Sequence, residues 1–140
     1  MTPSSRGEAT QSPVSIELEL QRDVQAPALA RAATAELADV LTLSRPTAQT
    51  LLLLVSEVVT NAVIHSKGAH EQPIMLAASA DKEAIHVAVT DAGPGFIPRQ
   101  RDPSSINDGY GLYLLEKAAS RWGVESRDAT TVWFELPRSG

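Results

Sequence analysis

The sequence predicts an α+β domain, in which an antiparallel-rich sheet is covered on one face by helices. Two observations support this prediction. Two stretches with the apolar spacing of helices, residues 27–43 and 46–65, are followed by two stretches joined by a tight turn, the pattern of a β-hairpin. Two more short strands are predicted near the end, and 140 residues with 43% hydrophobic content suffice for one domain.

The first half of the chain predicts one strand and two helices. Apolar and polar residues alternate from Val14 to Leu20, which is the period of a half-buried strand. The spacing of Ala and Leu from Pro27 to Leu43 predicts an amphipathic helix. A second helix is expected to have Ser44 as its cap and Pro46 in its first turn, and to end near His65.

The second half predicts two strand pairs, separated by a loop and a helix. In chain order these are a strand at 73–80, a turn at Asp81 and Lys82, a strand at 84–91, a loop at 92–108, a helix at about 111–121, and strands at 123–127 and 131–136 around Asp128. The loop is rich in Gly, Pro, Asp and Arg. It is either a lid that orders over a ligand or a plain surface loop.

Composition narrows the classes of function. A net charge of −5 argues against a nucleic-acid surface, because such surfaces need clustered Lys and Arg. The chain has no cysteine, which excludes disulfides and thiolate metal sites. We find no apolar run of roughly 20 residues and no secretion signal. We therefore expect a cytoplasmic protein whose domain spans residues 14–137, between a disordered tail at 1–13 and a short tail at 138–140.

Two polar residues stand out in the second predicted helix, which is apolar nearly all round and is therefore expected to be buried. Glu57 and Asn61 are four residues apart, so they share a face, which His65 continues. A buried carboxylate needs a partner, water or a ligand. Glu57 fits a general base and Asn61 an oxygen ligand for Mg²⁺ beside nucleotide phosphates. Alternatively, both belong to a polar rim bonded to neighbouring loops, and His65 is an end residue favoured by the helix dipole.

Glycine-containing segments flank the loop. Residues 91–95, Asp-Ala-Gly-Pro-Gly, follow a strand, so Asp91 can accept a hydrogen bond from the exocyclic amine of adenine while the bare backbone approaches a ligand. Residues 108–112, Asp-Gly-Tyr-Gly-Leu, open a helix, where N–H groups and the helix dipole favour a phosphate. The plainer interpretations are an ordinary turn and a helix entry capped by Asp108.

The order of these segments resembles the GHKL ATPase superfamily, whose Bergerat fold is a two-layer α/β sandwich with a mixed, mostly antiparallel sheet covered on one face by helices. Residues 57–62 resemble its N box, residues 91–95 and 109–112 its two glycine boxes, and Thr131 the threonine that opens its last strand. The resemblance covers about residues 14–137. The short lid, together with the runs 57–66 and 111–123, is similar to the branch of anti-sigma factor serine/threonine kinases.

This resemblance implies ATP and Mg²⁺ as cofactors and assigns roles to residues. Glu57 would activate the substrate hydroxyl as the catalytic base, Asn61 would hold Mg²⁺, and Asp91 would read adenine. The other nucleotide-binding residues would be Gly93, Gly95, Gly109, Gly111, Leu112 and, on the adenine side, Thr131.

Two features depart from the family pattern. Ala129 stands where relatives often have a glycine ahead of the last strand, which changes that turn without removing nucleotide binding. The lid has no lysine, so phosphate contacts there would fall to Arg99 or Arg101.

The implied function is that of an ATP-binding anti-sigma factor with protein-serine kinase activity. Such a protein would act as a homodimer, sequester a sigma factor and phosphorylate a serine of an anti-anti-sigma partner with a STAS domain, without direct contact with nucleic acid or a membrane. The alternative is an ATP-dependent binding module that transfers no phosphate. A histidine kinase domain is less favoured, because no leading helix with a phospho-accepting histidine is expected here.

Overall fold

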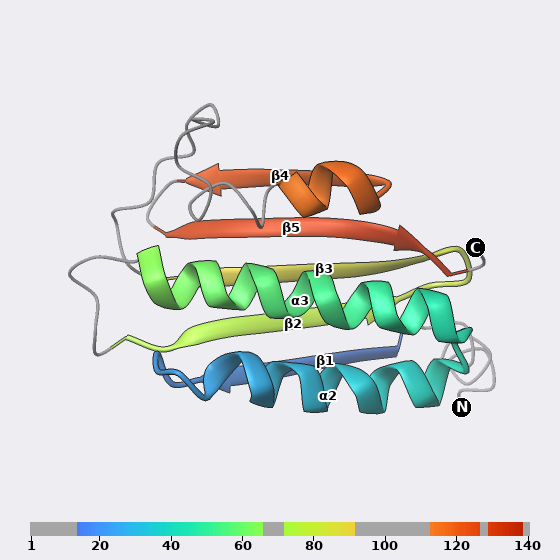
Figure 1. Cartoon of the computed structure of the whole chain (residues 1–140), viewed down its shortest axis with the longest axis horizontal. Coiled ribbons are helices and arrows are strands. Elements are labelled where there is room, and N and C mark those ends of the chain that lie inside the picture. Colours follow the sequence, from blue (N-terminus) through green and yellow to red (C-terminus); the bar gives the residue numbers. More distant parts are fainter. Residues whose placement is uncertain (1–13, 66–71, 92–112, 127–128, 139–140) are drawn as a thin grey trace, which may run out of the picture.

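The computed structural model describes residues 14–65, 72–91, 113–126 and 129–138 (Figure 1). These residues form two layers, a five-stranded sheet and helices that cover one of its faces, as the sequence predicted. In chain order the elements are β1 (Val14–Leu20), α2 (Ala26–Leu41), α3 (Arg45–His65), β2 (Ile74–Ala80), β3 (Ala84–Asp91), β4 (Arg121–Ser126) and β5 (Thr130–Pro137). A short helix at residues 113–118 precedes β4.

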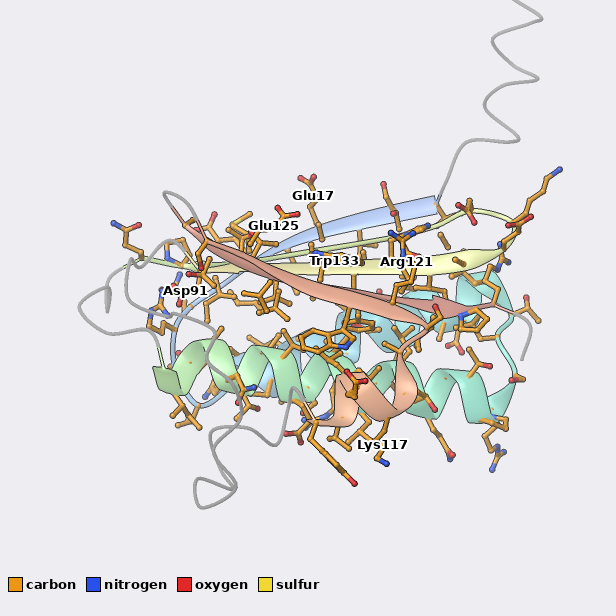
Figure 2. All side chains as sticks on the ribbon, turned by 90° about the horizontal axis from the view of Figure 1, so that it is seen from above. Glu17, Asp91, Lys117, Arg121, Glu125 and Trp133 are labelled. Atoms are coloured by element: carbon orange, nitrogen blue, oxygen red, sulfur yellow. The ribbon has the colours of Figure 1, made fainter. Side chains whose placement is uncertain are left out.

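The sheet is antiparallel throughout these five strands, in the order β1-β2-β3-β5-β4. Its two faces differ because successive side chains alternate. In β3, Ile85, Val87 and Val89 are at most 2% exposed and lie on the face that the helices cover. The opposite face carries charged side chains, among them those of Glu17 and Glu125 (Figure 2).

Helix α3 supplies much of the core, but it is not buried all round. The side chains toward the sheet and α2 are almost fully buried: Leu51, Leu54, Val55, Val58 and Val59. On its other side Leu53 is 46% and Ile64 is 63% exposed, so the expectation of burial all round was wrong. The physical reason is that α3 lies over the sheet with α2 beside it, while its back is uncovered (Figure 1).

The segment Arg45–Ile64 of α3 is long and apolar enough to cross a membrane by length and composition alone. Core helices meet the same criterion, which makes this weak evidence for a span. The fully buried side chains of α3 contribute to the same hydrophobic cluster as Phe134 of β5 and Leu76 of β2. In this fold α3 is therefore a core helix.

The junction between the two helices follows from local backbone chemistry. Helix α2 ends at Leu41, two residues before the expected end, because Thr42 adopts a left-handed conformation with φ 55°. The Leu43 N–H then donates to the Ala38 carbonyl at 3.1 Å, a bond that closes many helix ends. The predicted cap of α3 is present, since Ser44 Oγ accepts from the Thr47 N–H at 3.3 Å.

The end of the short helix differs from the prediction, which extended it to residue 121. The helix stops at residue 118, and Arg121 already belongs to β4. The competing interaction is sheet pairing: the Ser120 N–H donates to the Glu135 carbonyl at 2.9 Å, and Arg121 pairs with Glu135 in register. Trp122 then donates its indole N–H back to Glu116 at 3.1 Å, which holds the helix against the strand.

Candidate functional site

Helix α3 presents the two polar residues that the sequence singled out. Glu57 and Asn61 are both half-buried, whereas Val58 and Val59 between them are at most 2% exposed. Among the described residues, neither polar side chain has a hydrogen-bond partner. The segments at 66–71 and 92–112 lie outside the described residues, so the ligand site and the polar rim both stay predictions for this helix face.

The third predicted residue, Asp91, ends β3 on the face that the helices cover. Its alternation with Val87 and Val89 puts it inward, and it is 5% exposed. Figure 2 shows Asp91 at the same end of the molecule as the C-terminal end of α3. The structure therefore brings Asp91 near the end of α3 that carries Asn61.

An arginine that the sequence analysis missed joins these two ends. Arg22 lies in the short connection between β1 and α2, and its side chain is only 3% exposed. Its Nη1 donates to the Ala62 carbonyl at 3.0 Å, and its Nη2 donates to Asp91 Oδ1 at 2.5 Å. One guanidinium thus bonds the residue after Asn61 and the predicted adenine-reading carboxylate. No sequence spacing signals this contact, because Arg22 and Asp91 are 69 positions apart.

The pairing of β3 with β5 puts the neighbouring residues Thr130 and Thr131 on opposite faces of the sheet. Thr131 is opposite Thr90, and the two hydroxyls are 2.9 Å apart on the face away from the helices. Thr130 is opposite Asp91, inward and 5% exposed. The role predicted for Thr131 stays a prediction, but the register puts Thr130 on the same face as Asp91. The sequence analysis began the last strand at Thr131, whereas β5 begins one residue earlier, at Thr130. Neighbouring residues of a strand face opposite sides of the sheet, so this one residue decides which threonine faces inward.

The glycine segments cannot be placed in the same way. The predicted residues Gly93, Gly95, Gly109, Gly111 and Leu112 lie outside the described residues, as do Asp108, Arg99 and Arg101. Their roles therefore stay predictions. Among the residues that the structure does describe, no group of three or more His, Asp or Glu gathers to hold a metal ion.

Comparison with known families decides the assignment. Residues 12–136 match the model of the histidine kinase-like ATPase domain. The chain belongs to this family. The family resemblance predicted from the N box and the glycine boxes is thereby confirmed, and an ATPase domain implies that the chain binds ATP.

Two solved structures share the fold of this histidine kinase-like ATPase domain. One contains the RsbU and RsbW domains of Rv1364c from Mycobacterium tuberculosis, with a TM-score of 0.71 and 19% identity over 88% of this chain and 32% of that chain. The other is the SiaB–SiaC complex from Pseudomonas aeruginosa, with a TM-score of 0.61 and 9% identity over 98% of both chains. The chain spans about a third of the Rv1364c chain. No curated protein matches by sequence.

Proposed function

We propose that this domain is an ATP-dependent protein-serine kinase that acts as an anti-sigma factor. The observation that carries the proposal is the arrangement around α3. Glu57 and Asn61 lack protein partners among the described residues, and Arg22 ties Asp91 to the residue that follows Asn61. These contacts support a site in which Glu57 would be the proton acceptor, Asn61 would supply an amide oxygen and Asp91 would read the base.

In the proposed reaction the serine oxygen of a partner attacks the γ-phosphorus of ATP. The bond from that phosphorus to the β,γ-bridging oxygen breaks, ADP leaves, and Glu57 accepts the serine proton. Asn61 would hold Mg²⁺, which prefers oxygen ligands and would neutralise charge on the phosphates. Its amide fits this role because no described residue uses it. Asp91 would accept from the exocyclic amine of adenine, and Thr130 faces the same side.

The proposed partners are a sigma factor, which the domain would sequester, and an anti-anti-sigma factor with a STAS domain, which it would phosphorylate. We further propose that it acts as a homodimer in the cytoplasm, without direct nucleic-acid contact. Two structural neighbours support a partner-binding role: one carries an RsbW domain beside an RsbU domain, and the other is a complex of SiaB with SiaC. Both are less than 25% identical to this chain, so the likeness itself shows a shared fold, and the partners remain a proposal.

The deciding experiment uses the immobilised protein and host lysate, with Mg·ATP or Mg·ADP. We expect retention of a sigma factor and of a small partner that gains phosphoserine only with ATP, as read by mass spectrometry. Glu57→Ala should keep ATP binding and reduce phosphotransfer about 100-fold or more. Glu125→Ala, on the open face of the sheet, is the matched control (Figure 2). Unchanged transfer by Glu57→Ala would sink the general-base assignment.

The same experiment tests the alternative, an ATP-tuned binding module. In that case a partner is retained in a nucleotide-dependent manner, but no phosphoserine forms on it. Glu57 has no partner among the described residues, which fits a proton acceptor in a kinase, whereas a module that only binds assigns this carboxylate no role.

A further inference from the structure

The buried ion pair between Arg22 and Asp91 lies at the predicted base-binding end of the site. The two side chains are 3% and 7% exposed. In an ion pair this deeply buried, the free energy lost on removing both charges from water offsets much of their attraction. Such a pair therefore contributes little to the stability of the fold. A pair placed on the residue expected to read adenine therefore needs an explanation in terms of recognition.

A carboxylate at the end of a strand has a soft last torsion, since the terminal side-chain torsion of aspartate is broad. Reading an exocyclic amine requires one carboxylate oxygen in a fixed direction. The bond from Arg22 Nη2 to Asp91 Oδ1 restricts that torsion. A guanidinium suits this task, because it is planar, always charged and carries its donors in a rigid fork.

Arg22 is itself held in place on two sides. Its Nη1 donates to the Ala62 carbonyl in α3. Its own segment is a bonded turn, in which the Asp23 N–H donates to the Gln21 carbonyl at 2.9 Å and Asp23 Oδ1 accepts from the Gln25 N–H at 2.9 Å. The guanidinium is thus a fixed point against which the carboxylate of Asp91 can be oriented.

We propose that Arg22 is a positioning residue for base recognition, which orients Asp91 so that the site prefers a purine with an exocyclic amine. This inference rests on the proposed function, in which Asp91 reads adenine. Arg22 touches neither the phosphates nor the reacting atoms in this scheme. Its effect on nucleotide binding therefore falls on the choice of base.

The probes are Mg·ADP and Mg·IDP, which differ at the base: hypoxanthine carries a carbonyl in place of the amine of adenine. The full chain binds each in calorimetric titrations, and the quantity of interest is the ratio of the two Kd values. We expect the wild type to prefer ADP by about tenfold or more, since one buried hydrogen bond is at stake. Arg22→Met should lower that preference at least threefold, mainly through weaker ADP binding.

Two further variants separate positioning from a general loss of structure. Arg22→Lys keeps the charge but not the fork, and should recover part of the preference. Arg31→Met removes a different arginine contact to α3, the bond from Arg31 Nη1 in α2 to Ser56 Oγ at 2.9 Å, and should leave both affinities unchanged. If Arg22→Met fails to fold, as seen by circular dichroism, Arg22→Lys carries the test.

The outcomes are distinguishable. Equal weakening of ADP and IDP binding by the Arg22 variants, with the ratio unchanged, would overturn the inference in favour of a purely structural role. Tighter ADP binding by Arg22→Met would overturn it too, because Arg22 would then compete with the base. A wild type that binds ADP without any preference over IDP would overturn the reading of adenine by Asp91, and the inference with it.

Discussion

The two ends of β3 carry contacts between a nitrogen-bearing side chain and carboxylates in opposite settings. At the Asp91 end, the guanidinium of Arg22 and its carboxylate partner are almost fully buried. At the Ala84 end, His86 lies 3.2 Å from Asp81 and 3.2 Å from Glu135, and these side chains are between 20% and 53% exposed. One strand thus connects a buried ion pair in the candidate site with a more exposed contact between a histidine and two carboxylates at a turn.

The difference in burial between the two contacts bears on whether each serves the stability of the fold or the binding of a ligand. An exposed pair gains little because water screens it and two side chains lose freedom. A buried pair is costly to form and more costly to break on one side, since the remaining charge is then left without compensation. A protein under selection for stability alone has little reason to build the second kind, which supports a role for the Asp91 end in ligand binding.

The largest expected effect comes from breaking the buried pair. Arg22→Met removes the guanidinium that pairs with the buried carboxylate of Asp91, and we expect a loss of about 3–5 kcal/mol in the free energy of unfolding. Urea unfolding at neutral pH measures this loss. Adding Asp91→Asn to Arg22→Met removes the buried negative charge that has lost its guanidinium partner, and should restore part of the lost stability. A loss below about 1 kcal/mol for the single variant would mean that water reaches the site and screens the pair.

A smaller effect is expected at the exposed end, and it depends on pH. Backbone N–H groups of Glu83 and Ala84, and then His86, donate to the Asp81 carboxylate and lower its pKa from 3.8 to about 2. Because the folded pKa is depressed, this contribution to stability is present above pH 3.8 and is lost as the pH falls through about 2. The difference in unfolding free energy between wild type and Asp81→Asn should shrink as the pH falls from 4 to 2. A difference that persists unchanged at pH 2 contradicts this origin.

The smallest effect is expected for His86→Gln. The imidazole is 38% exposed and faces two carboxylates that already have other partners, the turn N–H groups for Asp81 and Arg121 for Glu135. We expect no resolvable change in the urea midpoint at physiological salt, and at most a slight one at low ionic strength. A change in the urea midpoint as large as that of Arg22→Met would contradict the proposed difference in stability between the contacts at the two ends of β3.

Local patterns predicted most of the fold. The bounds of β1 and β3 agree with the alternation of apolar residues, and Ser44 caps α3 as expected. The four-residue spacing of Glu57 and Asn61 also put both on one face of α3. These features depend on helix and strand periodicity, which is a property of neighbouring residues.

The features that were missed depend on tertiary pairing. Arg22 has no sequence signal, because its partners belong to α3 and β3. Thr130 faces inward because it is paired with Asp91 in the register of β3 and β5. A shift of this register by one residue would turn Thr130 to the opposite face of the sheet. The exposed back of α3 likewise depends on what covers it, whereas its apolar sequence alone suggested burial.

The contact between Arg22 and Asp91 also bears on the order of folding. It closes a separation of 69 residues, whereas β2 and β3 form a hairpin around a short turn. Closing a long loop costs more chain entropy than closing a short one, so the hairpin can form while β1 is still unattached. The contact between Arg22 and Asp91 is then completed only when β1 has joined β2. A partly folded chain that has formed only this hairpin would therefore hold Asp91 in its strand before the guanidinium that pairs with it is in place.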